Sequence, residues 1–382
     1  MYYTLMQKVK VFAGQGSLSQ LPEIMKEAGF TNAFLVCDGG IVKMGLAARV
    51  QEILAAAGLK STLYDKVLPD PPSGLVGEGH RLCGEAGCDC VIAIGGGSSI
   101  DTAKGINILR FNEGNILDYA NPATPMNPAS GLIVIPTTSG TGSELSNGVI
   151  ITDESTGLKA AMLAPNAMSE YALIDPELTT GMPPMLTMFT GLDVFSHAAE
   201  AYTTILASVM IEPICEKLMQ DVVTYLPRVI KDGSDIEARE RMLVSASLGG
   251  WMLACACAHV GHSIAHVVGA TFHIPHGRAC AASLPPSLEF IAPACPAKVR
   301  KIGEILGATY DGSETPEQIG AKTAEAYKAF VAGIGLPALP FAKPGEEGMA
   351  KLAYDIAHEP LAVLTPIPVT EENARAMVEK IF

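Results

Sequence analysis

The first half of the chain alternates short apolar runs with amphipathic stretches. Apolar runs typical of buried strands occur at residues 33–37, 62–67, 90–94, 132–135 and 172–174, and a hairpin pattern occurs at 149–152 and 158–163. Apolar residues at helical spacing occupy residues 44–57 and 75–86. This alternation predicts an α/β arrangement, in which helices cover both faces of a parallel sheet.

The pattern changes near residue 180. After Gly181, two consecutive prolines are followed by long helical patterns, and no further run predicts a strand. With 382 residues, the chain also exceeds the usual size of a single hydrophobic core. We therefore predict two domains, an α/β domain over residues 1–180 and an all-α domain over residues 181–382.

Composition and charge exclude several classes of protein. Hydrophobic residues make up 48% and charged residues 17% of the chain, which excludes disorder. The net charge of -14 argues against nucleic acid and anionic membranes as partners, because both favour a basic surface. No run reaches the ~18 apolar residues of a membrane span, and the N-terminus lacks the regions of a signal peptide. The nine cysteines follow no disulfide or metal-knuckle spacing, which predicts reduced, packed thiols in a cytoplasmic protein.

A glycine-rich turn follows the predicted strand at 90–94 and precedes a helical pattern. Its residues are Gly95, Gly96, Gly97 and Ser98. Backbone N–H groups at such a helix N-terminus can bind a pyrophosphate, and glycines allow its close approach. Ser98 or Ser99 can cap the helix and donate to phosphate. The alternative interpretation is a tight strand-to-helix turn that binds nothing, since the turn lacks the G-x-G-x-x-G pattern.

Asp38 lies at the end of an earlier predicted parallel strand. A carboxylate there can accept hydrogen bonds from both hydroxyls of an adenosine ribose and would repel a 2′-phosphate, so it favours NAD over NADP. The alternative is a turn aspartate before Gly39 and Gly40. Residues 136–144, after another strand, are rich in hydroxyl side chains and glycine and could donate hydrogen bonds to the nicotinamide ribose and the phosphates.

Histidines cluster in the second half of the chain. Six of the eight lie between residues 197 and 276. Asp193 and His197 are four residues apart in a helical pattern, so their side chains share one face. The others of this cluster are His259, His262, His266, His273 and His276. One carboxylate and three imidazoles suit Fe2+, Zn2+ or Mn2+, and the remaining histidines are expected to support the site or to be structural.

Taken together, these motifs resemble those of the iron-containing (group III) alcohol dehydrogenases over essentially the whole chain. The motifs are Gly95-Gly96-Gly97-Ser98 with Asp101 and Lys104, Pro136-Thr137-Thr138 with Gly140-Thr141 and Ser143-Glu144, Gly191-Leu192-Asp193 with His197 and Glu200, Gly261-His262 to His266, and Pro275-His276-Gly277. The resemblance implies a Rossmann-like sheet in the first domain and a dehydroquinate-synthase-like fold overall.

The resemblance also implies the ligands and the cofactor. The metal, iron with zinc as the alternative, would be held between the two domains by Asp193, His197, His262 and His276. His266 corresponds to an additional histidine near the nicotinamide and is our candidate for proton transfer. The residues that fall where the family binds NAD are Asp38, Gly95, Gly96, Gly97, Ser98, Asp101, Thr137, Thr138, Thr141 and Lys159.

The expected activity is metal-dependent hydride transfer between NAD and a small primary alcohol or aldehyde, in a homo-oligomer. Segments 255–259 and 365–368 depart from the family pattern, so the substrate is left open. Activities like those of glycerol dehydrogenase or maleylacetate reductase are near alternatives. A dehydroquinate-synthase-like cyclase would need basic residues at the metal, where Arg278 stands alone. A non-catalytic metal-binding protein would have no use for the cofactor motifs.

Overall fold

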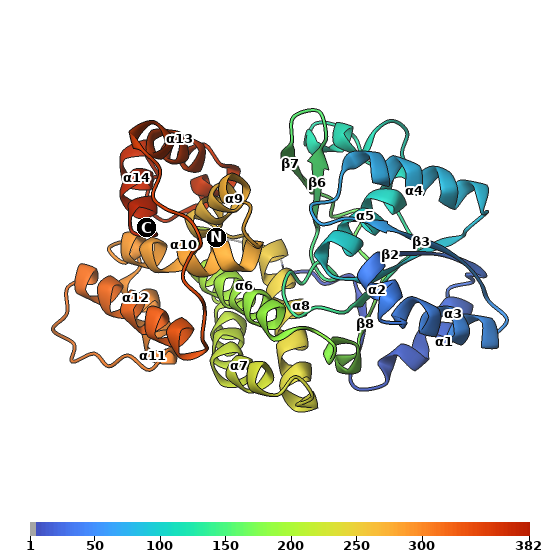
Figure 1. Ribbon diagram of the computed structural model, residues 1–382, viewed down its shortest axis with the longest axis horizontal. Helices are drawn as coiled ribbons and strands as arrows, with labels where there is room; N and C mark the ends of the chain where they lie inside the picture. The colour runs from blue at the N-terminus through green and yellow to red at the C-terminus, as the bar shows by residue number, and fades with distance from the viewer. Residues whose placement is uncertain (1–4) are drawn as a thin grey trace. The chain divides into compact units, whose positions relative to one another are not determined.

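The computed structural model describes residues 5–382, which form two compact units (Figure 1). One unit comprises residues 6–182, and the other comprises residues 183–382 together with Leu5. The first contains all of the strands, whereas residues 183–382 contain helices and no strand. The predicted fold class, an α/β part followed by an all-α part, is therefore confirmed.

The first unit is built on a six-stranded parallel sheet with the strand order β1-β8-β5-β4-β2-β3. The strands are β1 (Lys10–Ala13), β2 (Asn32–Asp38), β3 (Lys60–Val67), β4 (Cys90–Gly95), β5 (Leu132–Pro136) and β8 (Tyr171–Ile174). The predicted strands are all present. The sequence analysis missed β1, because this short edge strand is mostly exposed and has no buried apolar run.

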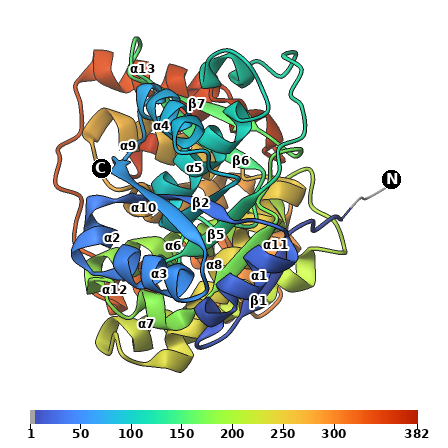
Figure 2. The ribbon, with the colours of Figure 1, turned by 90° about the vertical axis from the view of Figure 1, so that its right-hand side faces the viewer.

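Helices cover both faces of this sheet, as Figures 1 and 2 show. On one face, Phe34 and Val36 of β2 pack against α4 (Ser73–Glu85) and α5 (Gly97–Leu109). On the other face, Leu35 and Cys37 pack against α1 (Leu21–Glu27) and α3 (Leu46–Ala56). Burial on both faces explains the continuous apolar runs. The helices of this unit are η1 (Ser17–Gln20), α1 (Leu21–Glu27), α2 (Gly39–Lys43), α3 (Leu46–Ala56), α4 (Ser73–Glu85), α5 (Gly97–Leu109), η2 (Ile116–Ala120) and η3 (Pro176–Thr179).

Two local details differ from or extend the sequence analysis. The helix predicted over residues 44–57 begins only at Leu46, because Gly45 has a left-handed φ of 76° and separates α3 from the short helix α2. The predicted hairpin is present as the antiparallel pair β6 (Gly148–Asp153) and β7 (Leu158–Leu163).

The strand order places the ends of β2 and β4 side by side. The chain passes from β2 outward to β3 and then returns to β4 on the other side of β2. This reversal is the topological switch point at which open parallel sheets bind ligands, at the carboxyl ends of the strands. Asp38 ends β2 and Gly95 ends β4, so both lie at this point.

The second unit is a bundle of helices in which α10 packs against α6, α9 and α12. Its helices are α6 (Pro184–Thr203), α7 (Glu212–Lys231), α8 (Ile236–Ala256), α9 (Val260–Phe272), α10 (His276–Ile291), α11 (Pro296–Ile305), α12 (Pro316–Gly333), α13 (Glu346–Ala357), η4 (Pro360–Leu364) and α14 (Glu371–Glu379). Among residues 5–382, no single helix is long and apolar enough to cross a membrane, and α8 with α9 pass that test only as a pair bent by 112°.

A buried ion pair ties α5 to the loop that follows β5. Lys104 is 1% exposed, and its Nζ donates to Ser143 Oγ at 2.9 Å and to the Gly148 carbonyl at 2.7 Å. It lies 4.0 Å from Asp101 Oδ1, and the Asp101 oxygens also accept from Ser143 Oγ and from the Ile150 N–H. Burial raises the pKa of Asp101 and lowers that of Lys104, while the mutual attraction of the two charges opposes both shifts.

Removing the Lys104 charge should destabilise the first unit. We expect Lys104→Met to lower the free energy of unfolding by about 3 kcal/mol, because it leaves a buried carboxylate without its cation. The measurement is denaturant unfolding. As a control, Lys66→Met removes an exposed cation paired with Glu78 and should cost less than about 1 kcal/mol. Equal costs for the two variants would contradict the assignment of Lys104 to a buried structural pair.

Candidate metal centre and nucleotide-binding turn

A buried carboxylate oxygen stands at the centre of the helical unit. Oδ1 of Asp193, on α6, has no hydrogen-bond partner among the described residues. Three imidazole Nε2 atoms surround it, those of His197 at 3.3 Å, His276 at 3.4 Å and His262 at 3.7 Å. These are the residues predicted as metal ligands, and the structure brings them together from α6, α9 and the first turn of α10.

The close approach of α10 to α6 depends on Gly277. A Cβ atom at this position would lie 2.0 Å from the Phe189 carbonyl oxygen and 3.3 Å from Asp193 Cβ. Only glycine therefore allows the first turn of α10 to sit directly against α6. The turn before it begins at His273, which ends α9 with a left-handed φ of 52°. This backbone path brings His276 back toward Asp193.

Glu200 fixes the orientation of His262. Its Oε1 lies 2.6 Å from His262 Nδ1, and its Oε2 accepts from the backbone N–H groups of His259 and His262. Burial raises the pKa of Glu200, but the charges of His262 and His259 and these hydrogen bonds outweigh burial and lower it to about 2. A carboxylate bound to Nδ1 of a histidine leaves Nε2 free toward a cation, which is the usual support of a metal-ligating histidine.

The protonation states also suit a cation. Burial lowers the pKa of His197 to about 4 and that of His276 to about 3, so both imidazoles are neutral at pH 7. These two imidazoles and the Asp193 oxygen without a donor offer lone pairs to the same point. Burial alone would lower the pKa of His262, but the charges of Cys280 and Glu200 outweigh burial and raise it, so His262 loses a proton when a cation binds. A divalent cation would satisfy these groups, so the residues present fit the metal expected from sequence.

One residue near this point was missed by the sequence analysis. The donor atoms of Asp193, His262, His276 and Cys280 all lie within 4.8 Å of one another. His197 is not part of this four-residue set, although its Nε2 lies closest to Asp193 Oδ1. The sequence analysis treats the nine cysteines as reduced thiols that are mostly packed as small hydrophobic groups. The position of Cys280, one helical turn after His276, is the signal that could have singled it out.

His266 lies beside the ligands and is held by Glu359. Its Nδ1 is 2.9 Å from Glu359 Oε1, and Ser263 Oγ donates to the other oxygen of Glu359 at 2.7 Å. The His266 ring stacks on that of His276, with 5.5 Å between centroids. Its side chain is 36% exposed, so it can exchange protons with solvent. Sequence reasoning missed Glu359, which lies 93 residues away along the chain.

The two remaining histidines of the cluster, His259 and His273, are not among the residues around the Asp193 oxygen. His259 is buried, and its Nε2 forms a hydrogen bond with Thr203 Oγ1 at 2.9 Å. His273 is exposed at the end of α9. The sequence analysis expects His259 to support the site or relay protons and His273 to be structural, and both roles stay predictions.

In the α/β unit, the glycine-rich turn after β4 lies next to residues at the ends of β2 and β5. A Cβ atom on Gly96 would lie 3.0 Å from Thr138 Oγ1, and one on Gly97 would lie 2.8 Å from Thr141 Cγ2. One on Gly95 would lie 3.7 Å from Asp38 Oδ2. The Thr137 N–H donates to the Gly95 carbonyl. Side chains in place of these glycines would fill the turn, so the glycines keep a narrow space open beside the backbone, which we call the cradle.

The start of α5 corrects one expectation. The helix begins at Gly97, and its N-cap is Gly96, with no side-chain cap. Neither Ser98 nor Ser99 caps it, because both lie inside its first turn. The N–H groups of that turn therefore have no capping side chain, and they are the groups that bind phosphate at a helix N-terminus. The cradle and the uncapped helix end fit the pyrophosphate of a dinucleotide.

Asp38 serves the local role that was weighed as its alternative. Its Oδ1 accepts from the Gly40 and Ile41 N–H groups and caps α2. Its other oxygen, Oδ2, is the atom that faces Gly95, so capping leaves one carboxylate oxygen for a ligand.

Two other charged residues that were predicted to bind NAD, Asp101 and Lys159, are already engaged in ion pairs. Asp101 is buried in the pair with Lys104, and Lys159 forms an exposed ion pair with Asp70 at 2.6 Å.

Comparison with known proteins decides the family. The sequence profile "Iron-containing alcohol dehydrogenase" matches residues 8–176, and the profile "Fe-containing alcohol dehydrogenase family, C-terminal" matches residues 187–382. The chain belongs to the iron-containing alcohol dehydrogenase family. The resemblance inferred from the motifs is therefore confirmed, and membership makes the protein an oxidoreductase.

Individual relatives match between 79% and 100% of the chain. It is 32% identical to a choline dehydrogenase of Bacillus subtilis over 97% of the chain and 92% of the relative. It is 33% identical to the NAD-dependent methanol dehydrogenase of Bacillus methanolicus, over 79% of each chain. The structure of an alcohol dehydrogenase from Oenococcus oeni matches with a TM-score of 0.94 and 28% identity, over 100% of both chains.

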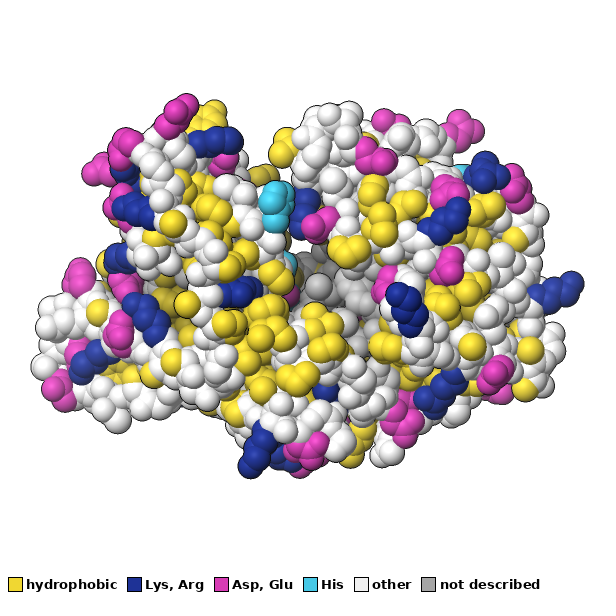
Figure 3. All heavy atoms as spheres, in the orientation of Figure 1, with side chains coloured by type: hydrophobic (Ala, Val, Ile, Leu, Met, Phe, Trp, Pro, Cys, Tyr) yellow, Lys and Arg dark blue, Asp and Glu magenta, His cyan; other side chains and the backbone are white. Residues whose placement is uncertain are grey.

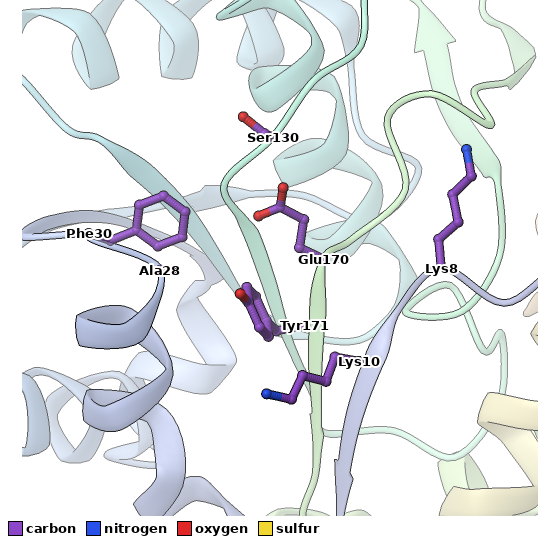
Figure 4. Close-up of a pocket in the computed structure, with 7 residues that line it drawn as sticks. All are labelled: Lys8, Lys10, Ala28, Phe30, Ser130, Glu170 and Tyr171. Atoms are coloured by element: carbon purple, nitrogen blue, oxygen red, sulfur yellow. The ribbon is translucent and has the colours of Figure 1, made fainter.

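Two further surface features can be described. A hollow of about 520 Å3 is lined by Lys8, Lys10, Ala28, Phe30, Ser130, Glu170 and Tyr171 (Figure 4). It lies at the amino ends of the strands, opposite the end where parallel sheets bind ligands. Its Glu170 and Lys8 hydrogen-bond to Gly131 and Pro165 of the backbone. On the face in Figure 3, acidic and basic side chains are interspersed on both units.

The role of Glu200 can be tested by metal affinity. We expect Glu200→Gln to weaken zinc binding by about 10–100-fold, because the amide orients His262 less firmly and makes its ring less basic. Equilibrium dialysis against zinc measures the change. Glu216→Gln is a matched control. Glu216, on α7, accepts a hydrogen bond from Tyr202, which lies on the same helix as Glu200, but it does not contact a ligand histidine in the described structure. An affinity unchanged by Glu200→Gln would refute this role.

Proposed function

We propose that this protein is an NAD-dependent, metal-dependent dehydrogenase that transfers a hydride between a small primary alcohol or aldehyde and the nicotinamide. The observation that carries the proposal is the buried Asp193 oxygen with three imidazole Nε2 atoms within 3.7 Å and no hydrogen donor. Membership of the family supports it further.

In this proposal, Asp193, His197, His262 and His276 hold the metal, which is Fe2+ with Zn2+ as the alternative. When bound, the ion supplies a Lewis acid that favours loss of the hydroxyl proton of an alcohol and polarises the carbonyl of an aldehyde. Glu200 keeps His262 oriented through Nδ1. Burial limits the competition of water for Asp193, His197 and His262, which are each less than 5% exposed, whereas His276 is 35% exposed.

We assign proton transfer to His266. Its Nδ1 is engaged by Glu359, so its Nε2 is the atom available to take a proton and pass it to solvent. Glu359 holds the ring at a fixed angle, because it is itself fixed by Ser263 and by the Leu361 N–H. His266 stacks on the ligand His276 and is itself 36% exposed, so it contacts both the metal ligands and solvent.

The glycine-rich turn is proposed to bind the pyrophosphate of NAD, and the cofactor when bound accepts the hydride at C4 of its nicotinamide. Gly95, Gly96 and Gly97 allow close approach of the phosphates, and the first turn of α5 offers its N–H groups. Thr138 and Thr141 line the same cradle. Asp38 Oδ2 is proposed to accept from the adenosine ribose, and a relative is named as NAD-dependent.

The test of this function is NAD reduction by the purified protein after anaerobic loading with Fe2+ or Zn2+. The substrate panel comprises small primary alcohols, diols and choline, because the relatives are named for choline and methanol. Turnover that depends on the metal is the expected result. Turnover that persists after complete removal of the metal would refute the metal's role. Absence of turnover with every alcohol tested, although NAD and metal are bound, would refute the substrate class. Cytoplasmic location and homo-oligomer formation stay predictions from the sequence.

Cofactor choice can be tested at Asp38. We expect Asp38→Gly to raise the ratio of kcat/KM for NADP to that for NAD by about tenfold or more, because a hydrogen bond to a charged group contributes about 1.5–3 kcal/mol. Glycine is chosen because it costs only a few tenths of a kcal/mol as an N-cap, so α2 is retained. Equal use of NADP and NAD by the parent protein would remove the basis for this expectation.

Proton transfer can be tested at His266. We expect His266→Ala to lower kcat on the order of 100-fold while bound metal, measured by elemental analysis, is retained. The exposed His273→Ala is the matched control and should leave kcat unchanged. A kcat of His266→Ala equal to that of the parent at every pH would rule out the relay.

A further inference from the structure

Cys280 lies among the metal ligands rather than in a purely apolar pocket. Its side chain is 1% exposed. The sulfur is 3.5 Å from His276 Nε2 and 3.8 Å from His262 Nε2. It lies nearer to Nε2 than to Nδ1 of His276, which is 4.0 Å away, so it stands at the end of the ring that faces Asp193.

The spacing of the donor atoms is that of a coordination shell. A metal with nitrogen ligands at about 2.0–2.1 Å and sulfur at about 2.3 Å, in tetrahedral geometry, separates its donors by roughly 3.3–3.6 Å. Here Asp193 Oδ1 lies 3.4 Å from His276 Nε2 and 3.7 Å from His262 Nε2. The Cys280 sulfur lies 3.5 and 3.8 Å from the same two nitrogens. All four donor atoms lie within 4.8 Å of one another, so the sulfur lies beside the same space as the donor atoms of Asp193, His262 and His276.

We propose that Cys280 is a further ligand of the metal ion, joining Asp193, His197, His262 and His276. This inference rests on the metal site of the proposed function and adds a thiolate to it. On binding, the S–H bond breaks, the sulfur–metal bond forms and the proton goes to solvent, with no change of oxidation state. The thiolate and the Asp193 carboxylate together then balance the charge of a divalent ion.

A thiolate ligand also predicts which metals the site prefers. Sulfur is a softer donor than oxygen or imidazole nitrogen, so it favours Zn2+ and Co2+ over Fe2+ relative to a site without it. The simpler interpretation is a thiol that donates one hydrogen bond to an imidazole. These two interpretations differ in whether sulfur touches the metal, which spectroscopy measures directly.

The experiment is titration of the metal-free protein with Co2+ under anaerobic conditions, followed by absorption spectroscopy. A thiolate bound to Co2+ gives a charge-transfer band in the near ultraviolet. We expect this band to rise to one equivalent of Co2+ in the parent, to be lost in Cys280→Ser, and to persist in Cys215→Ser. Cys215 is the matched control, because it is fully buried in α7 within the hydrophobic core.

The outcomes separate this inference from the proposed function. A parent that binds one Co2+ without the band, or a Cys280→Ser variant that keeps it, overturns the role of Cys280 and leaves the metal site standing. A parent that binds no Co2+ overturns the site itself.

If Cys280→Ser does not fold, X-ray absorption of the zinc-loaded parent decides in its place. A sulfur neighbour at about 2.3 Å supports ligation by Cys280, whose sulfur lies among the donor atoms of the other ligands. A shell of nitrogen and oxygen alone overturns it.

Discussion

A carboxylate oxygen buried without a hydrogen donor is the constraint on which the helical unit depends. Burying such a charge is costly unless a cation compensates it, and every neighbour of Asp193 is arranged to make that compensation possible. Its helix, α6, is buried along most of its length, and the Asp193 side chain is only 4% exposed. Glu200, two turns along the same helix, orients His262, and Gly277 lets α10 reach the same point.

The sequence analysis predicted the fold where its signals were local. Burial on both faces of the sheet gave β2 and β4 continuous apolar runs, and these were found within a residue or two of their ends. Edge strand β1 was missed, because exposure of most of its residues removes that signal. The break at Gly45 was missed because apolar spacing continues on both sides, and only the backbone angle reveals it.

Prediction of the site divides in the same way. Asp193 and His197 could be predicted as neighbouring ligands because a spacing of four residues on a helix is about one turn. The glycine-rich turn could be predicted because its glycines directly follow a strand. Glu359 could not be found, since nothing in a single sequence links it to His266 across the bundle. The spacing of four residues between His276 and Cys280 could have indicated a ligand. Buried free cysteines, however, usually pack as small hydrophobic groups, and this general tendency favours the packing interpretation.

The metal ligands come from helices that are distant in the sequence, and this has a consequence for folding. An ion bound to Asp193 on α6, His262 on α9 and His276 on α10 would act as a non-covalent crosslink, closing the chain between them much as a disulfide closes a loop. Because the unfolded chain offers no such assembled site, each rise in free metal concentration would shift the equilibrium toward the native bundle. Metal supply in the cell would then govern not only how many molecules are active but how long each one survives proteolysis.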